Sequence, residues 1–134
     1  MGLVKTILRF ADGRVMKGFT EGFDPNRASF RFQESNGTLA DGWKEMQLEG
    51  LKAIFFVKDF AGNSLYDDLK NFDEEEKIQG RRMQVTFLDG EQILGFAIGN
   101  DVRRTGFYLF PADLKSNNFG VFVISNAVHD IWYL

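Results

Sequence analysis

Arginines beside predicted turns are the residues of this sequence best suited to bind a charged ligand. Arg81 and Arg82 precede a strand-like segment, and Arg103 and Arg104 lie in a predicted turn close to Asp101. A guanidinium group presents N–H donors in a planar fork and can bind phosphate with two parallel hydrogen bonds. The four arginines therefore predict a basic patch that would suit a nucleotide or an RNA phosphate.

A second turn adds Asn26 and Arg27 to the candidate ligand-binding residues. Arg27 follows Asp24 by three residues, as Arg104 follows Asp101. The alternative interpretation is that each arginine forms an ion pair with the aspartate of its own turn. The recurrence of both residues in two turns favours this structural role.

Residues for catalysis are scarce. The chain has one histidine, His129, and no cysteine, which excludes thiolate chemistry and histidine-rich metal sites. Asp12 and Asp89 each precede a glycine in a predicted hairpin turn, where aspartate is expected for structural reasons. We therefore predict a protein that is not an enzyme and has no catalytic residue, metal or cofactor.

Length and charge narrow the function classes further. The 134 residues carry a net charge of −3, and the acidic excess lies in residues 58–77, with seven acids and three bases. A domain that coats nucleic acid is usually basic, so the balance disfavours RNA as a partner. The sequence shows neither a signal peptide nor an apolar run of about 20 residues, which predicts a cytoplasmic protein without a membrane partner.

Two pairs of adjacent aromatic residues predict an interaction surface. Phe55 and Phe56 close one strand-like segment, and Trp132 and Tyr133 close another. Neighbouring side chains on a strand point to opposite faces, so each pair can place one ring in a core and the other on a surface. We expect a ring of one pair to pack against a ring of the other, directly or through the linker between them, and any ring left exposed to bind a protein partner or a second copy.

An internal repeat organises the elements that position these residues. Segments 10–30 and 87–107 share nine identities in 21 positions at an offset of 77 residues, and segment 51–57 faces 128–134 in the same register. We interpret the chain as a first unit over residues 1–57, an acidic linker over 58–80 and a second unit over 81–134. A unit of this size is marginally stable alone, so the two units are expected to pack together.

Each unit is predicted to contain five short strands. Asp-Gly turns join the first two strands, and Gly18 and Gly95 mark a bulge or bend in the second strand of each unit. The spacing predicts an all-β protein with a small barrel in each unit. Within the linker, Leu65 and Leu69 lie on one face of a candidate short helix.

This order of strands resembles the Sm-like (SH3-type) barrel. Residues 9–18 resemble the first Sm motif, and residues 48–54 have the shape of the second. The resemblance implies two tandem five-stranded barrels and single-stranded RNA as a ligand. However, Glu49 and Asn126 stand where Sm proteins usually have the RNA-binding arginine. The two-unit arrangement also resembles an uncharacterised bacterial family of regulatory type.

A second resemblance concerns cyclic di-GMP. PilZ domains bind this dinucleotide through an Arg-x-x-x-Arg segment and an Asp/Asn-x-Ser-x-x-Gly turn. Asp101 and Gly106 match that turn, but Arg103 replaces its serine and the arginine segment is missing. We therefore predict a non-catalytic interaction or regulatory module that binds protein through barrel edge strands and exposed aromatics. A nucleotide- or RNA-binding domain that uses the arginine patch is the alternative.

Overall fold

The computed structural model describes residues 3–35, 42–60, 81–97, 105–112 and 117–134. These residues form ten β-strands and one short 3-10 turn, η1. The strands are β1 (Val4–Phe10), β2 (Val15–Thr20), β3 (Ser29–Glu34), β4 (Lys44–Gln47), β5 (Leu51–Val57), β6 (Arg81–Phe87), β7 (Gln92–Ala97), β8 (Gly106–Pro111), β9 (Asn118–Ile124) and β10 (Val128–Tyr133), with η1 at Ser125–Ala127.

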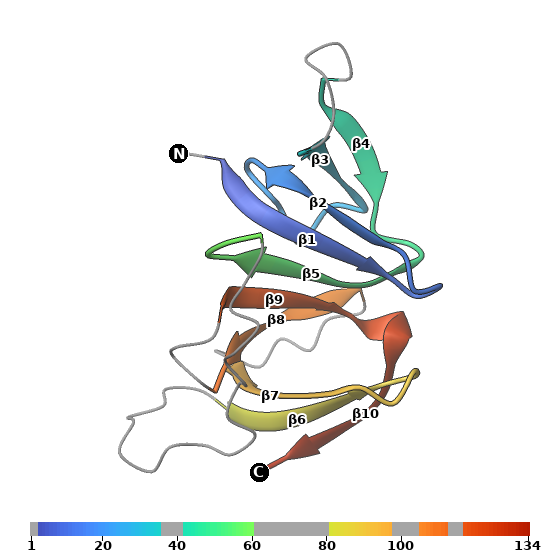
Figure 1. Ribbon diagram of the computed structural model, residues 1–134. Helices are drawn as coiled ribbons and strands as arrows, with labels where there is room; N and C mark the ends of the chain where they lie inside the picture. The colour runs from blue at the N-terminus through green and yellow to red at the C-terminus, as the bar shows by residue number, and fades with distance from the viewer. Residues whose placement is uncertain (1–2, 36–41, 61–80, 98–104, 113–116) are drawn as a thin grey trace.

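The ten strands belong to one open antiparallel sheet in the order β10-β6-β7-β8-β9-β5-β1-β2-β3-β4. We call residues 3–60 the first half and residues 81–134 the second half. The sheet curls within each half, and the halves meet where β5 lies beside β9 (Figure 1). The prediction of an all-β protein is confirmed. The finer prediction of two tandem barrels stays a prediction, because the strands are hydrogen-bonded in one sheet that does not close.

The strand registers of the two halves coincide when 77 is added to each residue number. Thr6 is opposite Gly18 in the first half, and Met83 is opposite Gly95 in the second. The pairing of β1 with β5 and the pairing of β6 with β10 even share a register shift at the same place. The sequence match at this offset therefore corresponds to matching backbone geometry.

The hairpin turns form as their sequences predict. Gly13 and Gly90 have φ angles of 96° and 93°, a region that glycine adopts without steric cost. In each turn the aspartate accepts a hydrogen bond from the backbone two residues later, at 3.0 Å for Asp12 and 2.9 Å for Asp89. These local bonds fix the connection between the first two strands of each half.

Two hydrophobic clusters fill the interior, and each draws on both halves. The cluster of the second half includes Ala53, Phe55 and Val57 of β5. The cluster of the first half includes Phe122 and Ile124 of β9. Because alternate residues of a strand face opposite ways, β5 and β9 each serve both clusters. The junction between the halves is therefore part of the core.

Phe55 and Phe56 do not make the direct contact with Trp132 and Tyr133 that the sequence predicts. Phe55 is buried in the cluster of the second half, and Phe56 packs near Tyr108, with 6.4 Å between ring centroids. The direct form of the predicted contact is wrong because β5 lies in the middle of the sheet beside β9, whereas β10 lies at one end. A contact through the linker lies outside the described residues, which omit 61–80.

Some predictions fall on residues outside the described ranges. They are the short helix expected within the linker, together with Asp101, Arg103 and Arg104. In the part of the chain that the structure describes, no helix has the length and apolar character needed to cross a bilayer.

Candidate functional site

A buried lysine joins the two halves through a small ion cluster, formed by Arg9, Lys52, Asp89 and Glu91. Lys52 lies on β5 with its side chain only 8% exposed, and its Nζ is 2.7 Å from Asp89 Oδ2. The same ammonium donates to the Glu91 carboxylate, which is also 3.2 Å from Arg9 Nη1. Lys52 and Arg9 come from the first half and the two acids from the second, so the cluster fixes one half against the other.

A cavity of about 140 Å³ lies beside the ion cluster, and its lining includes Lys52, Phe87 and Asp89. The Lys52 ammonium also lies 4.7 Å from the centre of the Phe87 ring, a cation–π contact that satisfies it further. Among the described residues, no three metal-binding side chains come together. Because the buried Lys52 ammonium has Asp89, Glu91 and the Phe87 ring as partners, we assign the ion cluster a structural role.

The ion cluster should make the stability of the fold depend on acid. The hydrogen bond from Lys52, together with that from the Glu91 N–H, lowers the pKa of Asp89 below its ordinary 3.8. A carboxyl group with a lowered folded-state pKa stabilises the fold above its unfolded pKa, and this contribution disappears as the pH falls through the folded value. We expect wild type to lose thermal stability below about pH 4, and Asp89→Asn to lose less over the same pH range.

Thermal melts from pH 7 to pH 2 measure this effect. Glu49→Gln provides the control, because it removes an exposed carboxyl outside the ion cluster. The same acid dependence in wild type and in Asp89→Asn would contradict a role for the Asp89 carboxylate.

The free edge of β10 is a different kind of site. Among the described strands β10 pairs only with β6, and at its end the Leu134 N–H donates to Arg82 O at 3.0 Å. Backbone N–H groups alternate in direction along a strand, so the Tyr133 N–H points away from β6, toward the free side. Trp132, Tyr133 and Leu134 are 62%, 49% and 64% exposed. This edge, which we call the β10 edge, combines backbone polar groups with large apolar side chains.

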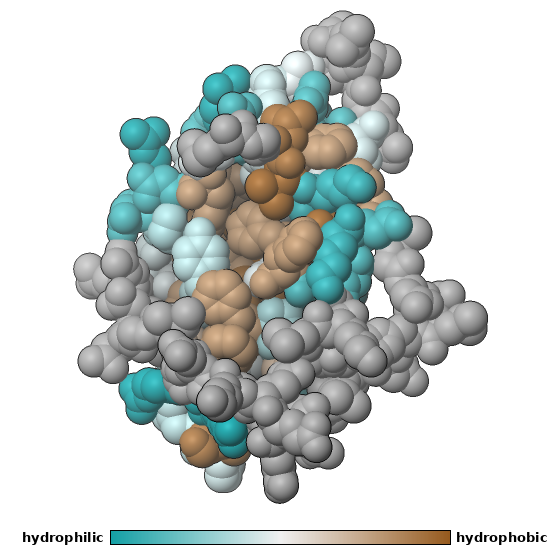
Figure 2. Space-filling view, turned by 90° about the vertical axis from the view of Figure 1, so that its left-hand side faces the viewer, coloured by the Kyte–Doolittle hydropathy of each residue, from teal (hydrophilic) through white to brown (hydrophobic). Residues whose placement is uncertain are grey.

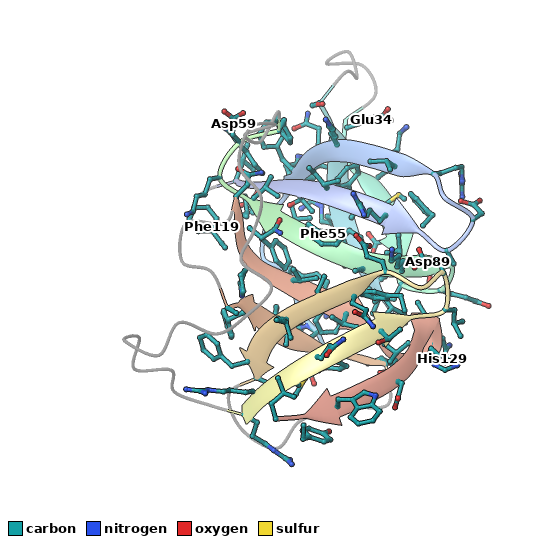
Figure 3. The ribbon with its side chains drawn as sticks, turned by 60° about the horizontal axis from the view of Figure 1, so that its bottom comes forward. Glu34, Phe55, Asp59, Asp89, Phe119 and His129 are labelled. Carbon is teal, nitrogen blue, oxygen red and sulfur yellow. The ribbon has the colours of Figure 1, made fainter. Side chains whose placement is uncertain are left out.

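The Asp130 carboxylate occupies part of the β10 edge. Its Oδ1 accepts a hydrogen bond from the Ile131 N–H at 2.9 Å, and its Oδ2 accepts one from Trp132 Nε1 at 2.6 Å. The carboxylate therefore occupies one backbone donor of the edge and holds the indole beside it. Charged side chains on an edge strand oppose pairing with other chains. His129 is exposed and points away from the body of the protein (Figure 3).

The predicted arginine patch is only partly described, and its described members are engaged. The Arg81 guanidinium lies 4.2 Å from the centre of the Tyr133 ring, which links a candidate arginine to a candidate aromatic on the β10 edge. Arg82 is exposed on the same strand as Arg81. In the first half, Arg27 forms an ion pair of 3.7 Å with Asp24, and the Asn26 N–H donates to Asp24 Oδ1 at 2.9 Å. Arg27 therefore has the structural role that its spacing from Asp24 favours.

A second apolar surface lies where β5 ends and β9 begins. Leu3 and Phe119 are more than half exposed there, and the Lys58 ammonium lies 5.9 Å from the Phe119 ring centre. Figure 2 shows apolar side chains in a band on this face, between hydrophilic flanks. Both β5 and β9 already have a neighbour on each side, so this surface lacks the free backbone groups of the β10 edge.

These features define an all-β protein with one open antiparallel sheet, an ion cluster around a buried lysine between its halves, and an aromatic edge strand. The chain belongs to a family of unknown function, DUF6982, which matches residues 3–134. No curated protein and no solved structure matches the chain.

Proposed function

We propose that this protein is a non-catalytic interaction module that binds a protein strand along the β10 edge. The observation that supports this most directly is the exposure of Trp132 and Tyr133 on β10, and of Leu134 directly after it. Among the described strands, β10 has one free side. Exposed apolar groups favour association, and unpaired N–H and C=O groups give the partner strand its orientation. The proposal also includes an Sm-like curvature of the sheet in each half and a regulatory role for the protein.

A comparison within the chain supports the proposal. At the 77-residue offset, the counterparts of Phe55, Phe56 and Val57 of β5 are Trp132 and Tyr133 of β10 and Leu134 directly after it. In β5 these residues are buried or partly buried, because β9 covers that side of the strand. The same kind of strand is therefore covered in one half and open in the other.

The nucleotide- or RNA-binding alternative has weaker support. Arg81 stacks on Tyr133 and Arg27 pairs with Asp24, so both would have to leave existing partners to hold a phosphate. Of the four aromatic residues predicted to contact a partner, Trp132 and Tyr133 are the two that are exposed.

A peptide carrying residues 118–124, with lysines added at both ends for solubility, tests the proposal because this segment is the strand that covers β5. We expect it to shift the amide NMR signals of Ile131 and Tyr133. The double substitution Trp132→Ser and Tyr133→Ser should weaken binding by at least about tenfold, because both large rings leave the contact.

The control substitution is Phe119→Ser, which removes an exposed aromatic from a strand with both sides paired. It should leave peptide binding unchanged. If the peptide shifts no β10 amide, or binds the double variant as well as it binds wild type, the proposed function is wrong.

A further inference from the structure

We propose that the strand accepted by the β10 edge is β4 of a second copy of this chain. The inference rests on the proposed function and identifies its partner. In the sheet order, β10 and β4 are the two end strands, and each has one unpaired side among the described strands. They lie at opposite ends of the molecule, with β4 at the top and β10 at the bottom (Figure 1).

The chain already contains one contact of the required kind. At the 77-residue offset, β10 corresponds to β5 and β4 corresponds to β9, and β5 pairs with β9 in the middle of the sheet. Pairing β10 with β4 of the next copy would therefore repeat the internal junction between chains. Because two different surfaces meet, each added copy leaves a new free end, and the product is a closed ring or a filament.

The internal junction also sets the register. Phe55 is opposite Val121, so Trp132 should be opposite Lys44 of the second copy. By the same shift, the pair of Ile54 with Phe122 places Ile131 opposite Glu45.

Hydrogen-bond directions agree with this register. The Leu48 N–H donates to Ala28 O on the side of β3, so by alternation the Glu45 N–H points toward the free side of β4. The same alternation points the Ile131 N–H toward the free side of β10. The two residues can therefore exchange a pair of backbone hydrogen bonds.

Side chains in this register are complementary. Trp132 would face Lys44, whose side chain is half exposed, and the two could form a cation–π contact beside the 3.9 Å ion pair of Lys44 with Glu34. On the other face Tyr133 would meet Trp43, an aromatic cross-strand pair.

Asp130 limits the strength of this contact. Its counterpart in β5 is Ala53, which is fully buried beside β9. To pair as β5 does, β10 must release the Ile131 N–H from the Asp130 carboxylate and move that charge toward a buried position. Asp130→Ala should therefore lower the concentration needed for assembly by about tenfold.

Disulfide trapping tests the register, since the native chain has no cysteine. The pair of Ala53 with Val123 predicts that Asp130 lies opposite Met46 of the second copy. A mixture of the Asp130→Cys and Met46→Cys variants should form a mixed disulfide under mild oxidation. The control mixture pairs Asp130→Cys with Gln47→Cys, whose side chain points to the opposite face, and should form several-fold less.

Light scattering of the unmodified chain and of Asp130→Ala over a concentration series provides the second measurement. Asp130 is exposed, so its replacement should leave the fold intact. The proposal predicts a mass that rises with concentration, earlier for Asp130→Ala. Disulfides that join two Asp130→Cys chains in preference to the mixed product, or both proteins monomeric at millimolar concentration, would overturn it. If these tests fail while the peptide still shifts the β10 amides, the proposed function stands and its partner is a different protein.

Discussion

Replacing Gly18 with alanine is expected to destabilise the protein by more than about 3 kcal/mol, because the sheet leaves no room for a β-carbon there. An added Cβ would lie 2.1 Å from the backbone oxygen of Gln33 and 2.6 Å from Cζ of Phe32. The ring could rotate away, but the carbonyl belongs to β3, which pairs with β2 at this point. Urea unfolding followed by circular dichroism measures the loss of stability.

The matched control is Gly120→Ala, also a glycine within a strand. An added Cβ there would lie 3.6 Å from the Phe110 ring, an ordinary contact distance. We expect this variant to change the free energy of unfolding by about 1 kcal/mol or less. Similar losses for the two variants would show that the close approach of β2 and β3 does not constrain Gly18.

The role of Gly18 shows what the sequence could and could not predict. A glycine inside a strand-like segment, recurring as Gly95, predicts a special backbone position. The Asp-Gly turns and the 77-residue offset likewise predict hairpins and registers that the structure has. Which backbone atom approaches Gly18 depends on how β3 crosses β2, and the local sequence carries no signal for that distance.

The ion cluster was missed for a related reason. Lys52 stands in an apolar segment, and this is the signal that could have drawn attention to it. Its partners, Asp89 and Glu91, approach it only because β5 pairs with β9 and brings the second half against the first. These two strands are far apart in the sequence, and the periodicity of each strand does not indicate that they pair.

Phe55 and Trp132 show most clearly that local sequence does not reveal which strands become neighbours. They occupy equivalent positions, opposite Ile7 and Gln84 respectively, yet Phe55 is buried and Trp132 is exposed. Figure 3 shows Phe55 in the interior between the halves. β5 and β10 each have one neighbour in their own half, and the exposure of these residues depends on whether another strand pairs with the opposite side of the strand. Sequence patterns therefore predicted the aromatic pairs as candidates but could not tell which pair remained open.

Phe122→Ala is expected to cost about 3 to 5 kcal/mol and to loosen the first half, although Phe122 belongs to the second. Its side chain is 1% exposed and lies in the hydrophobic cluster of the first half. The Phe122 ring centroid is 5.2 Å from that of Phe23 and 5.2 Å from that of Tyr108. Truncation would leave a cavity between these rings.

Hydrogen exchange at Leu8 and Phe32 measures this prediction, because both residues are buried in the first half. We expect their backbone amides to lose protection in Phe122→Ala, with one cooperative transition for the whole chain. Phe119→Ala, an exposed residue on the same strand, should change stability by about 0.5 kcal/mol or less. Full protection of the first half in Phe122→Ala would mean that it has a sufficient core of its own. Loss of protection would mean that β9 completes that core by covering β5. The proposed second copy would cover β10 in the equivalent way.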